Sequence, residues 1–406
     1  MSPSLEGIRI IDLTHFVAGP WATSLLGDFG ADVIKIERPG VGDGSRHLDR
    51  LFGEGRSSYF VGLNRSKRCL ALDVHTPDGQ EVLHRLLASA DVVIANFRPG
   101  VMQRLGLGYE QLKAKYPRLI PVSITAYGED GPLATKPAMD IIIQAQGGVM
   151  GLTGEPGRPP VRIGVPIADF VGSYLAFSAV VLGLFVRQTQ GIAQQIEVNL
   201  LDGQVSMLAN LMAGYAKTGN PTGPQGSGHS QIVPYQVFET LDQPIVIGCL
   251  TEEFWRSFCK AIERADLIDN PHFLTNADRV ENREKLIPIL DAIMKSRCHS
   301  DWLHGMQANG VPCASINNLQ DLIDSEQVGR NGMVQTVSHP SLGPITVVGN
   351  PLHLRTTPPQ SHHYAPSLGE HSQEILEELG YTKADIELLL NTKSSNACKR
   401  KDGSEC

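Results

Sequence analysis

A single carboxylate interrupts the most apolar part of the sequence. Asp169 lies in GVPIADFVGSY (164–174), which is followed by the almost wholly apolar run LAFSAVVLGLF (175–185). An ionised carboxylate beside a buried helix costs stability unless a partner compensates its charge or the protein uses it chemically. Because Asp is also a common helix N-cap, a structural role competes with a chemical one at this position. Asp140, in the sequence AMD, has the same two interpretations: a carboxylate that orients the site, or a helix cap.

The motifs of several well-known sites are missing. THFVAGP (14–20) follows the first apolar strand, where the usual nicotinamide site has G-x-G-x-x-G, and no P-loop or G-x-S-x-G motif occurs. The seven cysteines include no C-x-x-C pair and no metal-ligand spacing. SHH (361–363) has no acidic or thiol partner nearby, so a solvated loop is favoured over a ligand set. We therefore expect neither a metal nor a tightly bound cofactor.

Length and composition limit the class of protein. A chain of 406 residues with 41% hydrophobic and 19% charged residues predicts two soluble globular domains. The net charge of −8 argues against a nucleic-acid partner. The longest apolar run (174–185) is shorter than the roughly 20 residues that span a bilayer, so we expect a buried helix and no membrane association. Because no leader is visible, the prediction is a cytoplasmic protein, or a mitochondrial-matrix protein if a leader has been removed.

The elements that must position Asp169 alternate between strands and helices. Short apolar strands are predicted at 7–13, 31–37, 69–74, 91–97 and 119–125. Helices are predicted at 21–30 and 78–90, the second with Thr76 as its N-cap. This alternation predicts an α/β domain with a parallel sheet.

The pattern changes in the second half of the chain. Residues 194–219 predict a strand and one long helix, and 220–230 form a Gly/Pro/Ser-rich loop before a smaller α/β unit. The predicted organisation is a large domain over 1–220, a small domain over 221–325, a return to the large domain over 326–390, and a disordered tail over 391–406.

Six collinear blocks resemble the class III CoA-transferases, the family of formyl-CoA transferase and carnitine CoA-transferase. They are LEGIRIIDLTHFVAGPWATSLLGDFGADVIKIERPGVGD, NRSKRCLALDVHTPDGQEVL, DVVIANFRPGVMQRLGLGYEQL, SITAYGEDGP, GVPIADFVGSYLAFSAVVLGL and PSLGEHSQEILEELGY. The resemblance implies a large Rossmann-like parallel-sheet domain built from both chain ends, a smaller inserted α/β domain and an interlocked homodimer. It also implies that Asp169 is a nucleophile that forms a covalent aspartyl anhydride and an aspartyl-CoA thioester.

The same resemblance implies a set of residues that bind the CoA thioester substrate. They are His15, Val17, Ala18, Arg38, Leu72, Asp73, Asn96, Phe97, Arg98, Arg104, Lys136 and Met139. The arginines are suited to the phosphates and Phe97 to the adenine, although a solvated surface is the competing interpretation. Val17 is a departure, because the formyl-CoA enzymes have glutamine there, and this puts formyl or oxalyl transfer in doubt.

HSQIVPYQVF (229–238) and the stretch from INNLQDLIDSEQV to HPSLGPITV look most like the branch that uses succinyl-CoA and glutarate. We therefore expect CoA transfer from succinyl-CoA to a C4–C6 dicarboxylic acid such as glutarate or itaconate, with Arg46, Arg162 or His229 holding the distal carboxylate. One alternative is CoA transfer to a monocarboxylic acid. The other is an α-methylacyl-CoA racemase, whose histidine and glutamate fall here at Met139 and Thr251.

Overall fold

The computed structural model describes residues 2–360 and 363–391 and divides them into two compact units. Unit 1 comprises the residues up to 147, residues 164–207 and the residues from 327, and unit 2 comprises 148–163 and 208–326. This division differs from the predicted boundaries at 148–163 and 208–220. In unit 2 the N–H of Gly226 donates to the carbonyl of Gly154 at 2.8 Å, which ties the first segment to the second. The predicted tail lies outside the described residues, apart from Asn391.

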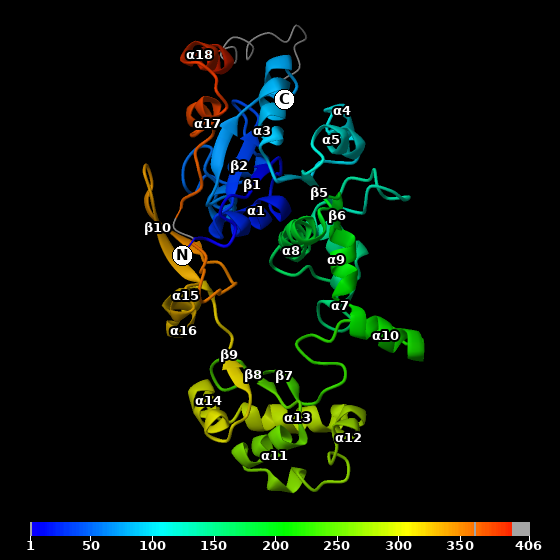
Figure 1. Ribbon diagram of the computed structural model, residues 1–406. Coiled ribbons are helices and arrows are strands. Elements are labelled where there is room, and N and C mark those ends of the chain that lie inside the picture. The colour runs from blue at the N-terminus through cyan, green and yellow to red at the C-terminus, as the bar shows by residue number, and fades with distance from the viewer. Residues whose placement is uncertain (1, 361–362, 392–406) are drawn as a thin grey trace, which may run out of the picture. The chain divides into compact units, whose positions relative to one another are not determined.

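A six-stranded parallel sheet forms the centre of unit 1 (Figure 1). Its strands are β1 (Arg9–Asp12), β2 (Asp32–Glu37), β3 (Arg68–Ala71), β4 (Val92–Ala95), β5 (Ile120–Thr125) and β6 (Ile196–Asn199), in the order β3-β2-β1-β4-β5-β6. The predicted α/β fold with a parallel sheet is confirmed. Ile10 and Ile11 point to opposite faces and are both fully buried, as expected for a sheet covered on both sides.

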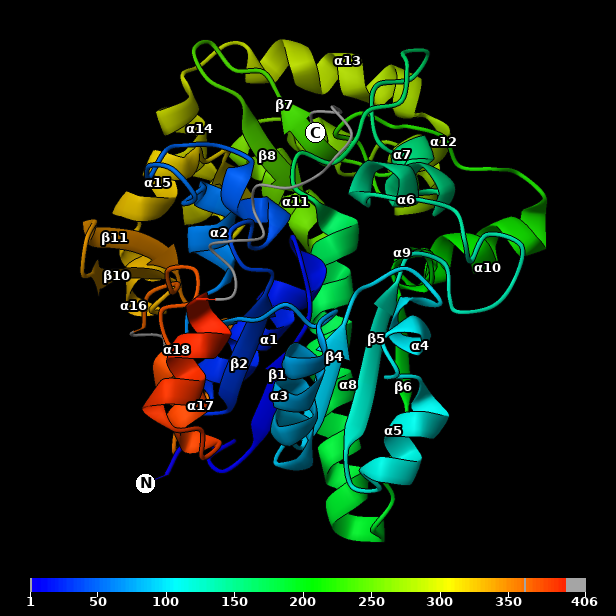
Figure 2. The same cartoon turned by 90° about the horizontal axis from the view of Figure 1, so that it is seen from above.

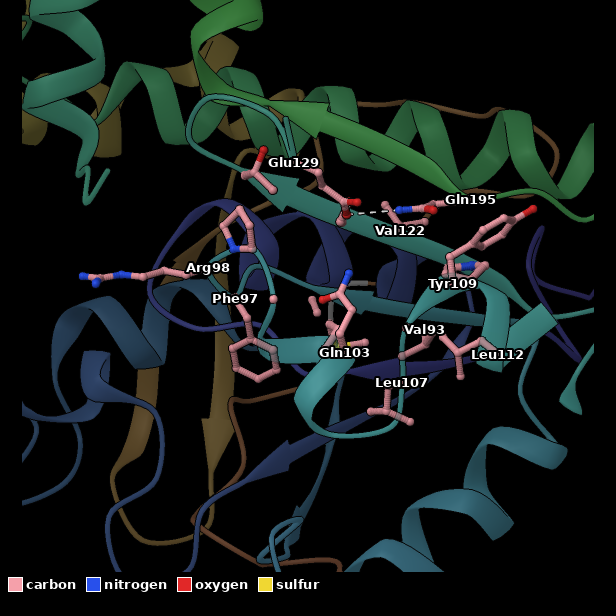
Figure 3. Close-up of a pocket in the computed structure, with 18 of the residues that line it drawn as sticks. Val93, Phe97, Arg98, Gln103, Leu107, Tyr109, Leu112, Val122, Glu129 and Gln195 are labelled. Carbon is pink, nitrogen blue, oxygen red and sulfur yellow. Dashed lines mark hydrogen bonds between the residues drawn. The ribbon is translucent and has the colours of Figure 1, made fainter. Parts of the chain in front are cut away.

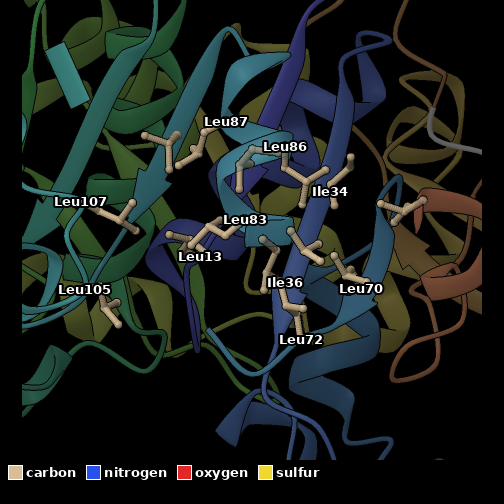
Figure 4. Packing of buried hydrophobic residues seen from close by; sticks show 14 of the residues in the cluster. Leu13, Ile34, Ile36, Leu70, Leu72, Leu83, Leu86, Leu87, Leu105 and Leu107 are labelled. Atoms are coloured by element: carbon tan, nitrogen blue, oxygen red, sulfur yellow. The ribbon is translucent and has the colours of Figure 1, made fainter. Parts of the chain in front are cut away.

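Two layers of helices cover the sheet. On one face, α1 (Ala18–Asp28) and α8 (Ile167–Gln190) pack on Ile10, Val33 and Val122. The other face carries α3 (Pro77–Ala88), α5 (Tyr109–Lys115), α17 (Ser372–Glu378) and α18 (Lys383–Asn391). Figure 2 shows α3 and α8 on opposite sides of the strands, and Figure 4 shows the leucine- and isoleucine-rich cluster beneath α3. Thr76 caps α3 as predicted, accepting the Gly79 N–H at 3.1 Å.

Helix α8 departs from the buried helix that its composition predicts. Its buried residues form one stripe of mostly small side chains: Ala168, Gly172, Ser173, Ala176, Val180 and Gly183. A β-carbon on Gly172 would lie 2.3 Å from Leu200, so this stripe packs tightly on its neighbours. Leu182 and Phe185, in contrast, are 61% and 60% exposed. Among the described helices, α8 alone is long and apolar enough to cross a membrane. Core helices of soluble proteins meet the same criterion, so this is weak evidence.

The other elements are shorter. Unit 1 also contains η1 (Gly44–His47), α2 (Ser58–Leu63), α4 (Val101–Arg104), α6 (Asp140–Gln146), α9 (Leu200–Ser206), β10 (Val334–His339) and β11 (Gly343–Val348), and α16 (Glu326–Arg330) begins at its boundary. The single long helix predicted within 194–219 is two helices, α9 and α10 (Ala209–Thr218). The break falls where the chain passes from unit 1 to unit 2.

Unit 2 has a core of its own. A three-stranded antiparallel sheet of β7 (Tyr235–Phe238), β8 (Ile245–Gly248) and β9 (Cys313–Ser315) packs on helices around the buried Trp255 and Trp302. Its helices are α7 (Val149–Leu152), α10, α11 (Glu252–Ala261), η2 (Ala265–Leu267), α12 (Asn276–Glu281), α13 (Arg283–Met294), α14 (His299–Ala308) and α15 (Leu319–Asp324). Unit 2 thus combines an antiparallel sheet and helices around one core.

Candidate active site

The strand order reverses its direction between β1 and β4. Chain connections leave these two adjacent strands in opposite directions, and ligands of open α/β sheets bind at the carboxyl ends of such strands. His15 follows β1, and Asn96 and Phe97 follow β4. The Asn96 side chain accepts the His15 N–H and donates to the His15 carbonyl, both at 2.8 Å, while the His15 and Phe97 rings lie 5.5 Å apart. Three of the residues implied by the resemblance therefore meet at this point.

A buried ion pair holds the loop between β1 and α1. Lys35 Nζ donates to the Thr14 carbonyl at 2.6 Å and lies 3.0 Å from Asp43 Oδ2, and both side chains are fully buried. Burial opposes the charge on each group, but the attraction between them wins: the pKa of Lys35 is held above its usual range and that of Asp43 below it. Asp43 Oδ1 also accepts the Phe16 N–H at 3.1 Å. The loop is thus fixed from two sides.

Phe16, at the tip of this loop, has an unusual backbone conformation. Its φ of 66° lies in the left-handed region, which is strongly disfavoured for a bulky side chain. The ring is 49% exposed and rests against Gly44, where a β-carbon would come within 2.8 Å of it. Strain of this kind gathers at functional sites and costs about 1–3 kcal/mol. Sequence reasoning passed over Phe16, since no composition signal marks a strained aromatic residue.

The strain at Phe16 predicts an inverted order of stability. We expect the free energy of unfolding of Phe16→Gly to exceed that of Phe16→Ala by about 1 kcal/mol, because only glycine adopts this φ without strain. Urea denaturation of the two variants measures the difference. At Tyr59, an exposed position inside helix α2, the same pair of substitutions should give the usual order, with alanine the more stable. If alanine were the more stable substitution at position 16 as well, the result would contradict strain at Phe16.

Exposed basic side chains lie beyond the carboxyl ends of the same strands. Arg38 comes directly after β2, Arg98 follows β4, and Arg104 ends α4. All three are exposed, and none forms an ion pair with any residue that the structure describes. Lys136 is exposed as well. These cations are available for an anionic ligand.

The remaining residues of the implied CoA site lie in different surroundings. Leu72 is 5% exposed and belongs to the core cluster, so its side chain is occupied by packing. Val17 and Ala18 are also buried, and their backbone opens α1 without a side-chain cap. The Asp73 carboxylate accepts the His75 N–H at 3.1 Å and so shapes the turn before α3.

Arg46 does not fit the predicted role of holding a distal carboxylate. Its guanidinium already binds both oxygens of Glu37, at 2.7 and 2.8 Å, donates to the Pro366 carbonyl and stacks 3.4 Å from the centre of the Phe60 ring. With 3% exposure, it has no free face for a substrate. The other two candidates, Arg162 and His229, belong to unit 2 and stay predictions.

Asp169 is the third residue of α8, and Pro166 is the N-cap. The interpretation of Asp169 as the N-cap is therefore wrong. Its carboxylate is partly buried and accepts no hydrogen bond from the residues described in the structure. Burial, with a smaller contribution from the charge of Asp140, raises the pKa of Asp169 from 3.8 to about 7. One turn further along α8, a β-carbon on Gly172 would lie 3.9 Å from Ala18, so the start of α8 adjoins the loop of Phe16.

A pocket of about 220 Å³ opens beside the Phe97 loop (Figure 3). Val93, Val122, Leu107 and Leu112 are among its apolar lining residues, while Glu129 is held by Ser123 and by Gln195 at 3.0 and 3.1 Å. Asp169 does not line this pocket. Across the described part of the chain, no cluster of three His, Cys, Asp or Glu side chains is arranged to hold a metal ion.

The two positions that a racemase would use are occupied by unsuitable groups. Met139, the N-cap of α6, is 77% exposed, and a thioether accepts no proton at neutral pH. Thr251 caps α11 by accepting the Phe254 N–H at 3.2 Å. Neither residue supplies the proton transfer that racemisation needs.

The chain is similar to known proteins over nearly its whole length. The model of CoA-transferase family III matches residues 5–372. A succinyl-CoA:glutarate CoA-transferase of Mus musculus is 38% identical over 95% of this chain and 89% of that protein. A succinate–glutarate CoA-transferase of Agrobacterium fabrum is 34% identical over 93% of this chain and 96% of that protein. The crystal structure of a CAIB/BAIF family protein from Brucella suis, 34% identical, superimposes with a TM-score of 0.83 over 93% of this chain and 100% of that chain.

Proposed function

The chain belongs to CoA-transferase family III, and we propose that it moves CoA from succinyl-CoA to a C4–C6 dicarboxylic acid, with Asp169 as the nucleophile. The observation that carries the proposal is the Asp169 carboxylate. It is partly buried, accepts no hydrogen bond within the described structure, and lies in the first turn of a helix whose Gly172 is close to Ala18, the residue that begins α1. The names of the relatives in mouse and Agrobacterium support a dicarboxylic acid such as glutarate as the acceptor.

The reaction would proceed through covalent steps on Asp169. A carboxylate oxygen attacks the thioester carbonyl, the C–S bond breaks, and CoA leaves as a thiolate with the acyl group held as a mixed anhydride. The thiolate then attacks the Asp169 carbonyl, releasing succinate and leaving CoA on the aspartyl group as a thioester. The acceptor acid takes the CoA by the same two steps in reverse. Splitting one exchange into such steps is nucleophilic catalysis and needs no ATP.

The environment of Asp169 suits this role. A carboxylate with a pKa of about 7 is more basic, and so more nucleophilic, than an ordinary aspartate, yet it is substantially ionised at neutral pH. The first N–H groups of α1 lack a side-chain cap, and Ala18 at the start of α1 lies close to Gly172, one turn beyond Asp169 in α8. We propose that they stabilise the oxyanions that form at the thioester and anhydride carbons.

An exchange assay tests the proposal. Purified protein is mixed with succinyl-CoA and, one at a time, glutarate, itaconate, mesaconate, malate, oxalate, formate and a carnitine-type betaine. Mass spectrometry then identifies each new acyl-CoA. A new diacid thioester formed without ATP supports the proposal, and exchange only with formate or the betaine would contradict the dicarboxylate acceptor.

The unpaired arginines predict a specific effect on CoA binding. We expect each of Arg38→Gln, Arg98→Gln and Arg104→Gln to raise KM for the acyl-CoA about 10-fold with little change in kcat, because each loses about 1.4 kcal/mol of phosphate binding. The effect should shrink at high salt. Arg118→Gln is the matched control, because Arg118 is exposed and precedes β5, at the amino-terminal ends of the strands. A KM unchanged in all three variants would contradict the assignment.

The exposed face of α8 supports a homodimer. Leu182 and Phe185 are large apolar side chains on a helix of a globular unit, and such patches commonly mark protein interfaces. We propose that a second copy of the chain covers them. Sedimentation velocity measures the mass in solution, and a monomer at micromolar concentration would contradict this part of the proposal.

A further inference from the structure

Asp140 bridges two helices at the site. It begins α6, and its Oδ1 accepts the N–H of Ala168, the second residue of α8, at 2.8 Å. Its Oδ2 accepts a hydrogen bond from Gln144 at 2.7 Å. The N-cap of α8, Pro166, has no side chain able to accept such a bond. Asp140 therefore supplies, from a neighbouring helix, the acceptor that an N-cap side chain normally provides.

This arrangement changes the electrostatics of the nucleophile. The N-terminus of a helix carries a partial positive charge, which would ordinarily stabilise an ionised Asp169 in the first turn. Here the Asp140 carboxylate already occupies that end of α8, and its negative charge acts on Asp169 as well. Burial followed by this charge raises the pKa of Asp169 to about 7.

The other charged groups on the elements packed against α8 have partners of their own. In α1, Asp28 binds Arg65, and in β6, Glu197 accepts the Glu129 N–H. In α9, Asp202 accepts a hydrogen bond from Asn199, and β5 (IPVSIT) carries no charged residue. Asp140 on α6 is the group whose charge acts on Asp169.

We propose that Asp140 is a positioning residue: from α6 it caps and fixes the first turn of α8, and so holds the Asp169 carboxylate in place for attack on the thioester. The inference rests on the proposed function, because it assumes that Asp169 is the nucleophile. Under this proposal Asp140 has both roles that the sequence suggests, because the same carboxylate caps a helix and orients the site.

Asp140→Asn separates the charge from the hydrogen bonds. The asparagine Oδ1 can still accept the Ala168 N–H, and the Gln144 amide can turn to accept from the new NH₂ group. Removal of the like charge should lower the pKa of Asp169. The acid limb of the kcat profile should therefore move to lower pH, while kcat on the plateau falls several-fold and KM for the acyl-CoA stays the same. Asp202→Asn, on α9, is the matched control and should leave the profile unchanged.

A second measurement reads the titration of Asp169 without catalysis. A carbodiimide modifies protonated carboxyl groups, so the rate of modification of the Asp169 peptide, followed by mass spectrometry across pH, reports its protonation. We expect the midpoint to shift downward in Asp140→Asn. An unchanged midpoint and an unchanged kcat profile would overturn the proposal for Asp140. Retained exchange in Asp169→Ala would instead overturn the proposed function.

Discussion

Replacing Asp169 by alanine is expected to lower kcat for CoA exchange by at least about 10⁴-fold, because removal of a covalent nucleophile leaves only binding and oxyanion stabilisation. The measurement is the rate of new acyl-CoA formation from succinyl-CoA with the best acceptor of the panel. Mass spectrometry of the wild-type protein after incubation with succinyl-CoA should find CoA on the peptide that contains Asp169, and the variant should carry none. Exchange above trace level in the variant would rule out the covalent mechanism.

Asp169→Asn provides the control for folding. The raised pKa of Asp169 fixes the sign of the change in stability that we expect from this substitution. The folded state holds the proton of Asp169 up to about pH 7, whereas the unfolded chain releases it near 3.8, so ionisation destabilises the folded state progressively between these values. The neutral asparagine avoids this cost. We expect Asp169→Asn to be more stable than wild type by on the order of 2 kcal/mol at pH 8 and about equal to it at pH 4. Thermal unfolding at the two pH values measures the difference.

Lys35→Met is expected to lower the free energy of unfolding by about 3–5 kcal/mol, because removal of one partner leaves buried charges uncompensated. Asp43 would lose its cation, and the Thr14 carbonyl would lose its donor. Since both contacts hold the loop before α1, the fraction that stays folded should also show a raised KM for the acyl-CoA. Urea denaturation measures the first effect and steady-state kinetics the second.

Lys217→Met is the control for this variant, because Lys217 is an exposed lysine in α10. The pH dependence adds a sharper condition. The depressed pKa of Asp43 contributes stability above about pH 4 that is lost at lower pH, and the raised pKa of Lys35 contributes stability below about pH 10. The loss in Lys35→Met should therefore be constant from pH 5 to 9 and shrink in acid. A loss below about 1 kcal/mol at pH 7 would contradict the importance of the pair.

The fold was predictable where local pattern and tertiary structure agree. Each of the first five strands is a short apolar run bounded by turn residues, and the structure has a parallel strand within each predicted range except that β3 begins at Arg68, one residue early. The boundary between the two units was harder to predict. The segment 148–163 joins unit 2 through contacts such as that of Gly154 with Gly226, more than seventy positions away, and no local pattern records such a contact.

The site was predictable in its residue types more than in its geometry. Asp169 stood out because a lone acid in an apolar run is costly, and the structure leaves it without a hydrogen bond from the described residues. Arg46 was misjudged because a sequence does not show that Glu37 binds it from the preceding strand. The pairing of Lys35 with Asp43 was missed for the same reason, although a lysine in the middle of the apolar strand DVIKIE was a signal that a buried partner existed.

Strand β3 forms one edge of the parallel sheet. Its backbone is covered by residues from near the end of the chain: the Cys69 carbonyl accepts the His371 N–H, and the Ala71 N–H donates to Ser372. During synthesis on the ribosome, about 300 residues must be added between the emergence of β3 and that of its cover. Throughout this interval an apolar strand edge is open to pairing with other nascent chains. We therefore expect chains that end before Gly369 to aggregate, and the full-length protein to depend on chaperones until translation is nearly complete.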